Sequence, residues 1–134
     1  MTNTDEKLDE QVSEVMARSR SREEEIRRGV EALQSALKWV TEDEAARHSG
    51  GAGYIRDFLR ALAGGYNGKC DIYSLMCLLD EKRSMWVSDI FVGAMRCQHP
   101  TDMYMAAGFS GDFPEQRALN LINDTDPESD ATTS

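Results

Sequence analysis

The amino-acid sequence predicts an all-α fold, a compact bundle of about four to six helices, from three observations. Apolar residues recur at helical spacing along most of the chain. No run of strict apolar–polar alternation bounded by turn residues indicates a strand. Of the 134 residues, 40% are hydrophobic and 29% are charged, which is typical of a folded globular chain. We therefore expect one helical domain, over residues 21–123.

The N-terminal part of the chain predicts two helical stretches of unequal strength. Residues 1–20 are polar and predict a conditional helix with a thin apolar stripe (Leu8, Val12, Val15 and Met16). Ser21 and Glu24 have the spacing of a capping box, so a stronger helix is expected to begin there. Its apolar residues at spacings of three and four predict one buried face (Ile26, Val30, Leu33, Leu37 and Val40).

The middle of the chain predicts a loop, an amphipathic helix and a central apolar helix. The glycines of residues 50–53 predict that the loop after Thr41 extends to Gly53. A helix over residues 54–62 should bury its apolar side and turn Arg56, Asp57 and Arg60 to water. Asn67-Gly68 predicts a turn, and Asp71 can cap the next helix. Because residues 71–79 are apolar on most sides, they are predicted to be the hub of the bundle.

The C-terminal third predicts three more helices and a tail. A helix containing Trp86, Ile90 and Phe91 should end near His99-Pro100, because proline disfavours helical geometry in the residue before it. Thr101 can cap a short helix that continues to Ala107, and Pro114 can begin the last one. Residues 124–134 are acidic and almost without apolar side chains, which predicts a disordered tail.

Charge and segment length indicate a cytoplasmic protein. The net charge is -9, which disfavours general attraction to nucleic acid or anionic lipid. No apolar run approaches the roughly 20 residues that span a bilayer, and the N-terminus lacks the features of a secretory signal. The three cysteines are expected to be free thiols in a reducing compartment.

The candidate reactive groups do not form a familiar site. Cys70, Cys77, Cys97 and His99 are zinc-ligand types, but their spacing differs from that of structural zinc sites. A cysteine nucleophile with His48 or His99 as its base has no supporting motif. The glycines before residue 54 lack the lysine and hydroxyl of a phosphate loop. We therefore predict no catalytic, metal-binding or cofactor-binding residue, no cofactor, and a protein that is not an enzyme.

Several residues recur in an order that resembles a known family: Arg56 and Phe58-Leu59, then residues 71–75 with Leu79-Asp80, then Pro100 and Tyr104. The order resembles a family of small uncharacterised helical proteins from proteobacterial prophages and other mobile elements. The resemblance implies a helical fold and a mobile-element origin, and it carries over no catalytic residue. The chain departs from the family pattern at Met76, where a tryptophan is expected. It also adds an N-terminal helix and an acidic tail.

These observations favour a non-enzymatic protein that binds and modulates a host protein, with a host defence complex as one class of partner. The acidic run could stand in for nucleic-acid phosphates, and flexible thioethers suit adaptable surfaces. The candidate partner-binding residues are Glu42, Asp43, Glu44, Met103 and Met105. For the methionines, core filling is an equal alternative. A homodimer is also predicted, because the N-terminal stripe would leave apolar surface exposed, with Leu8, Val12 and Met16 at or near the interface. The alternative is a monomer whose N-terminal segment is frayed, since a short isolated helix is marginal in water.

The alternative function is that of a small DNA-associated regulator. Arginines between residues 18 and 28 could contact phosphates (Arg18, Arg20, Arg22, Arg27 and Arg28). However, Glu23, Glu24 and Glu25 lie among them at spacings that favour salt bridges on a solvated helix face. Nucleic acid is therefore the less favoured partner, and no membrane partner is expected.

Overall fold

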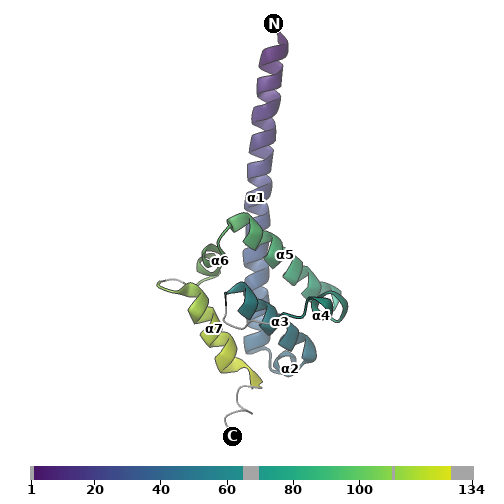
Figure 1. Ribbon diagram of the computed structural model, residues 1–134, viewed down its shortest axis with the longest axis vertical. Helices are drawn as coiled ribbons and strands as arrows, with labels where there is room; N and C mark the ends of the chain where they lie inside the picture. Colours follow the sequence, from purple (N-terminus) through teal and green to yellow (C-terminus); the bar gives the residue numbers. More distant parts are fainter. Residues whose placement is uncertain (1, 65–69, 110, 128–134) are drawn as a thin grey trace.

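The computed structural model describes residues 2–64, 70–109 and 111–127, and every regular element in these ranges is a helix. Six shorter helices gather around one end of a long helix, α1 (Thr2–Glu42), as Figure 1 shows. They are α2 (Glu44–Arg47), α3 (Gly50–Leu62), α4 (Ile72–Cys77), α5 (Glu81–Cys97), α6 (Pro100–Ala106) and α7 (Pro114–Thr125). The predicted all-α fold is confirmed. None of the described helices is both long enough and apolar enough to cross a membrane.

The C-terminal half of α1 is the centre of the bundle. The predicted buried face is confirmed for Leu33, Leu37 and Val40, whereas Ile26 and Val30 are half-buried. Two alanines, Ala32 and Ala36, are buried beside them. The other helices pack against this half, whereas the N-terminal half projects beyond them (Figure 1). The chain therefore divides into a folded body and a free helical arm.

The predicted helix start at Ser21 is wrong, because α1 runs without interruption through this residue. The Ser21 hydroxyl donates a hydrogen bond to Glu25 within the helix instead of capping its N-terminus. Ion pairs one turn apart support the continuous helix, among them Arg27 with Glu24 and Arg28 with Glu24. No glycine or proline interrupts residues 2–28, so nothing in the backbone ends the helix there.

The helices α1 and α5 cross at two glycines. A Cβ atom added to Gly29 would lie 2.9 Å from the Gly93 Cα atom, and one added to Gly93 would lie 3.0 Å from the Gly29 Cα atom. A side chain on either helix at this point would therefore push the two helices apart. Next to the crossing, the fully buried Ile90 belongs to the core.

The predicted hub over residues 71–79 is wrong. Helix α4 has only six residues, and of these only Ser74 and Leu75 are buried. The side chains of Ile72, Tyr73 and Met76 are exposed. A helix of fewer than two turns, capped by Asp71 at its start and followed by Asp80, is too short for neighbours to cover all its sides. The central position belongs to α1.

The predicted loop up to Gly53 is also wrong, because α3 begins at Gly50. Ser49 caps this helix, since its hydroxyl oxygen accepts a hydrogen bond from the Ala52 amide at 3.2 Å. Before it, Asp43 caps the short helix α2 in the same way through the Ala46 amide. The Ser49 cap fixes the start of α3 at Gly50, although glycines occupy its first turn. The helix ends as predicted, with Gly64 in the left-handed conformation.

Helices α6 and α7 close the body. The predicted start at Pro114 is confirmed, because this residue begins α7, whereas α6 begins at Pro100, one residue before Thr101. The predicted capping role of Thr101 is therefore wrong. Tyr104 is fully buried, and its hydroxyl donates a hydrogen bond to the Leu59 carbonyl at 3.2 Å. This bond ties α6 to α3.

The structure describes only part of the predicted acidic tail, residues 124–134. Residues 124–127 do not belong to a tail, because α7 continues to Thr125 and the Asp126 side chain is buried. Residues 128–134 of the predicted tail and the predicted turn at Asn67-Gly68 lie outside the described residues. The body therefore includes the chain up to at least Asp126.

Candidate functional site

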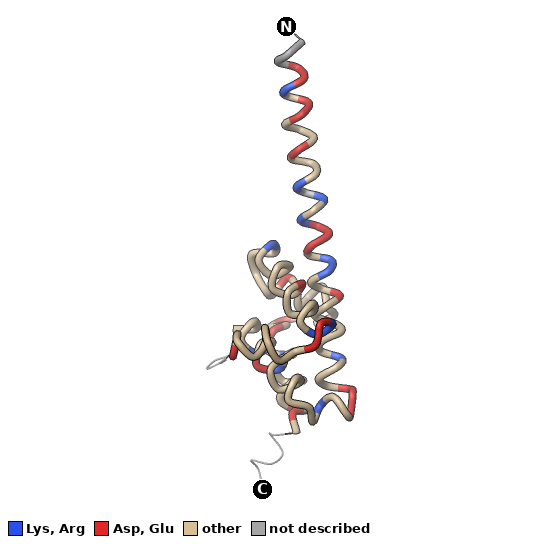
Figure 2. The backbone as a smooth tube through the Cα atoms, turned by 90° about the vertical axis from the view of Figure 1, so that its right-hand side faces the viewer, with Lys and Arg blue, Asp and Glu red and all other residues tan. Residues whose placement is uncertain are grey.

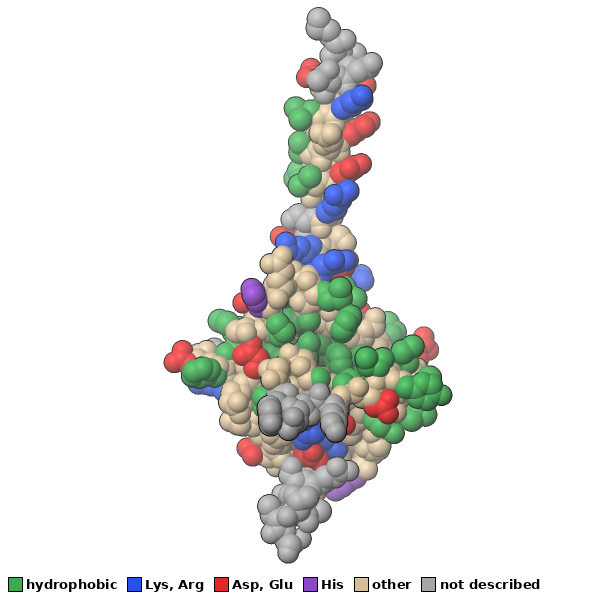
Figure 3. Space-filling view, viewed as in Figure 1, with side chains coloured by type: hydrophobic (Ala, Val, Ile, Leu, Met, Phe, Trp, Pro, Cys, Tyr) green, Lys and Arg blue, Asp and Glu red, His purple; other side chains and the backbone are tan. Residues whose placement is uncertain are grey.

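An open apolar groove of about 820 Å³ lies between α3, α4 and α5. Its lining is almost entirely hydrophobic: Phe58, Ala61 and Leu62 from α3, then Cys70, Ile72, Leu75 and Met76 from α4 and the residues before it, then Val87, Phe91 and Val92 from α5. Two serines of α5, Ser84 and Ser88, complete the lining. Hydrophobic side chains gather on this side of the body, around α4 and α5, in the space-filling view (Figure 3).

Large side chains in the groove stay open to solvent. Ile72 is 65% exposed, Met76 74% and Phe91 54%. Close to them on the surface, Tyr73, Leu78 and Met95 are also exposed. An apolar patch built from three helices is unusual on a monomer and typically marks a contact surface for another protein. The groove is therefore the strongest candidate site among the described residues.

One end of the groove is electrostatically negative. Burial raises the pKa of the Cys70 thiol, and the nearby carboxylates of Asp57 and Asp71 raise it further. Asp71 itself is held in the ionised form, because hydrogen bonds from the Ser74 hydroxyl and amide lower its pKa. A thiol with a raised pKa is a poor nucleophile at neutral pH, so Cys70 serves here as an apolar lining residue.

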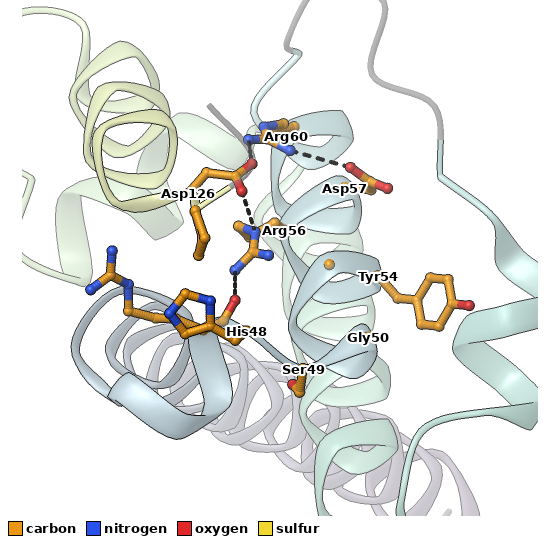
Figure 4. A pocket seen from close by; sticks show the side chains of 11 residues that line it. His48, Ser49, Gly50, Tyr54, Arg56, Asp57, Arg60 and Asp126 are labelled. Atoms are coloured by element: carbon orange, nitrogen blue, oxygen red, sulfur yellow. Dashed lines mark hydrogen bonds and ion pairs between the residues drawn. The ribbon is translucent and has the colours of Figure 1, made fainter. Parts of the chain in front are cut away.

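A second, polar pocket of about 390 Å³ lies where α2, α3 and the end of α7 meet (Figure 4). Asp126 forms ion pairs with two arginines of α3, with 3.5 Å between its Oδ1 atom and Arg56 Nε and 2.6 Å between its Oδ2 atom and Arg60 Nη2. Arg60 also pairs with Asp57 at 3.3 Å. The expectation that Arg56 faces water is wrong, since only 4% of it is exposed.

Backbone carbonyls satisfy the remaining donors of this pocket. Arg56 Nη1 donates to the Arg47 carbonyl at 3.2 Å, and Arg47 donates twice to the Thr125 carbonyl, at 3.0 and 2.8 Å. The arginines are thus engaged by the protein itself. The cluster fastens the end of α7 to α2 and α3, which is a structural function.

The sequence-predicted metal ligands do not come together. Among the residues that the structure describes, no three histidine, cysteine or carboxylate side chains could hold one metal ion. Cys70 and Cys97 are half-buried and Cys77 is exposed, all as free thiols. Burial raises the pKa of Cys97, with Asp102 adding to the effect and Arg22 opposing it.

The candidate arginines of α1 are mostly engaged with neighbouring carboxylates. Arg27 pairs with Glu24 and Glu31, and Arg28 with Glu24. Arg22 instead reaches the body, where its Nε atom donates to the Arg96 carbonyl at 3.1 Å. Arg18 is 4.0 Å from Glu14, and Arg20 is exposed. The arginines therefore do not form one continuous basic surface.

The predicted partner-binding residues are divided by the structure. Glu42 is exposed, but Asp43 caps α2, and Glu44 lies 3.1 Å from Arg47 and 3.8 Å from His48. Met103 is fully buried in the core, so its expected surface role is wrong, whereas Met105 is half exposed. Two residues of the acidic run, Asp43 and Glu44, thus stabilise the short helix α2.

The predicted dimer residues do lie on the surface. Leu8, Val12 and Met16 are each more than half exposed, and Val15 is exposed beside them. They form a hydrophobic line on one side of the projecting arm, with charged side chains on the other (Figure 3). No described part of the body covers this line.

Sequence reasoning missed the groove because it assigned its residues to the core. The available signal was the length of the apolar segment between Asp71 and Asp80, which allows fewer than two helical turns. It also missed a cation–π cluster, in which Arg83 lies 4.6 Å from the Trp39 ring centroid and 5.1 Å from that of Trp86. This cluster fixes the start of α5 against α1.

No protein-family model, curated protein or solved structure matches this chain. The residues on which the sequence resemblance rests have structural positions: Asp71 and Asp80 cap helices, Pro100 begins α6, and Phe58, Leu59 and Tyr104 are buried. These residues therefore support the fold.

Proposed function

We propose that this chain is a non-enzymatic, cytoplasmic protein-binding protein whose binding site is the groove between α3, α4 and α5. The observation that carries the proposal is the exposure of Ile72, Met76 and Phe91, which converge on this groove from two helices. Side chains of this size are the usual anchors of protein contacts, because burying them on binding removes much apolar area from water.

The occupant that suits the groove best is an amphipathic helix of another protein. A groove between packed helices accepts the apolar face of such a helix at spacings of three and four residues. The Asp71 carboxylate near the Cys70 end favours a helix with a basic residue beside its apolar face, whereas Asp57 already pairs with Arg60. A net charge of -9 favours the approach of the same kind of partner.

The wider function follows from the sequence resemblance. We propose that the protein is an accessory protein of phage or mobile-element origin that modulates a host protein, with a defence complex as the class of target. It acts as a homodimer. A DNA-associated role through Arg18 to Arg28 is less favoured, because acidic neighbours neutralise Arg27 and Arg28.

Matched variants test the groove. Met76→Asp places a carboxylate in the groove, whereas Met85→Asp places one at an exposed methionine of α5 outside it. Both methionines are exposed, so neither change should unfold the body. In affinity capture from the native host at physiological salt, the wild-type chain and Met85→Asp should retain the same stoichiometric protein, and Met76→Asp should lose it.

The location of the captured protein is then established by chemical cross-linking and mass spectrometry. Cross-links to α4 and α5 are expected. Retention by Met76→Asp, or cross-links confined to α2 and α7, would contradict the proposal, as would the absence of any stoichiometric protein. Recovery of DNA that is lost when Arg18, Arg20 and Arg22 become alanine would favour the nucleic-acid alternative.

A further inference from the structure

The free arm of α1 carries the same helical face that α5 covers further along. On the helix, Leu8, Val12 and Val15 lie on the same face as Ile26 and Leu33. Successive members of this set are separated by 4, 3, 11 and 7 residues, which are close to whole numbers of helical turns. In the body this face is covered by α5, which ends where Arg96 contacts Arg22 and Glu25. From Arg22 towards the N-terminus, nothing described covers it.

The charges of this arm are divided along its length. Residues 5–14 carry five carboxylates and one lysine, a net charge of -4, whereas residues 15–22 carry three arginines and no acid. Figure 2 shows this division, with acidic positions towards the N-terminus and basic positions towards the body. An uneven distribution of this kind opposes a parallel pair of identical helices, and it favours an antiparallel pair.

We propose that two copies of the chain associate through an antiparallel contact between their α1 arms, centred between Ser13 and Glu14. In this register Val12 of one copy lies beside Val15 of its partner. Asp5, which is in line with the stripe, lies beside Arg22 of the partner. Each acidic segment then faces a basic one.

The length of the arm agrees with this register. The 18 residues from 5 to 22 span about 27 Å at ~1.5 Å per residue, so Asp5 of each arm lies where the α5 helix of the other copy ends. The partner arm thus continues the cover that α5 provides. The contact is small beside the ~800 Å² per partner of a standard interface, so the dimer should dissociate on dilution and weaken with salt.

Charge reversal in the full-length chain tests the orientation. Asp5→Arg and Arg22→Asp each create two like-charge pairs in an antiparallel dimer, which should raise the dissociation constant about tenfold. The double variant restores opposite charges and should regain the wild-type constant. In an in-register parallel dimer, Asp5 faces Asp5 and Arg22 faces Arg22. Each single variant would then exchange one like-charge pair for another, and the dissociation constant should stay near the wild-type value.

Controls separate charge position from net charge. Glu10→Arg changes the charge as much as Asp5→Arg does, but Glu10 lies away from the stripe, so association should weaken much less than it does for Asp5→Arg. A loss caused only by the missing bond from Arg22 to the Arg96 carbonyl would persist in the double variant. Met76→Asp should dimerise normally, so failure of the proposed groove function leaves this result intact.

Sedimentation equilibrium gives the readout. The wild-type chain is expected to approach twice its 15.0 kDa mass as concentration rises. A single-chain mass at every concentration would overturn the proposal. A dimer whose constant is the same for Asp5→Arg and Glu10→Arg, or that the double variant does not restore, would overturn the antiparallel contact.

Discussion

At the scale of single residues, Arg56 shows how a charged side chain becomes part of a helical core. It lies on α3 between two apolar residues of the buried face, Ile55 and Phe58, and only 4% of it is exposed. Burial of this charge is stabilised because the guanidinium group forms an ion pair with Asp126 and donates a hydrogen bond to the Arg47 carbonyl. The acceptor comes from the far end of the chain, so no local pattern could predict it.

Asp126→Ala should therefore destabilise the protein strongly. Removing one partner of a buried ion pair leaves the other charge uncompensated, and the expected loss is about 3 kcal/mol in the free energy of unfolding. Chemical denaturation measures the change. Asp124→Ala, at an exposed position of the same helix, should stay within about 0.5 kcal/mol of the wild-type chain. Equal small effects would show that the Arg56 pair does not support the body.

Tyr104 should make the protein sensitive to alkali. Burial raises the pKa of its phenol, and the charge of Glu115 adds to the rise. Below about pH 10 the phenol is protonated in the folded and the unfolded protein. Above about pH 10 it ionises readily only in the unfolded protein, so the free energy of unfolding falls as pH rises. Tyr104→Phe should be less stable near neutral pH, because it loses the bond to Leu59. The deficit should shrink above about pH 10, and a constant deficit in denaturation experiments would contradict this.

At the scale of elements, the crossing of α1 and α5 is the closest contact of the fold. Gly29 and Gly93 let the two backbones meet, and the Met103 side chain fills the space beside them. The sequence shows both glycines within helical patterns. It does not show that they face each other, because their contact joins segments far apart in the chain.

Gly93→Ala should separate these helices. Its Cβ atom would lie 3.0 Å from the Gly29 Cα atom and 3.2 Å from the Glu25 carbonyl oxygen, which are backbone atoms that cannot turn away. The expected cost is about 1–3 kcal/mol in unfolding free energy. At Gly53 of α3 an added Cβ meets nothing within 4 Å, so Gly53→Ala should raise stability by about 0.5 kcal/mol. Denaturant titration of both variants checks the contrast.

The same scale shows how much of the fold could be predicted from the sequence. The positions of α5 and α7 and the buried face of α1 follow from apolar periodicity, Asp80 and Pro114, which are local signals. The sequence did not show which helix lies at the centre of the bundle. Apolar content made residues 71–79 a predicted centre, yet a short capped helix at the surface has the same composition as a buried one.

At the scale of the whole molecule, the chain combines a folded body with a helical arm. The exposed stripe of the arm was predicted from the sequence, because its spacing is visible in Leu8, Val12 and Met16. The groove could not be predicted, since Phe58, Met76 and Phe91 come from three helices whose relative placement depends on the whole core. The molecule thus has two separate apolar surfaces, one for the proposed contact between two copies and one for the proposed partner.

The central claim is that a partner helix occupies the groove, and hydrogen exchange in the partner-bound protein tests it most directly. Amides protected by tertiary contact exchange more slowly, so binding should slow exchange in α4 and in the part of α5 around Phe91. The residues of α2 and α7, on another side of the body, should exchange as they do in the free protein. Slowed exchange confined to α2, α7 or the N-terminal arm, with α4 and α5 unchanged, would contradict the claim.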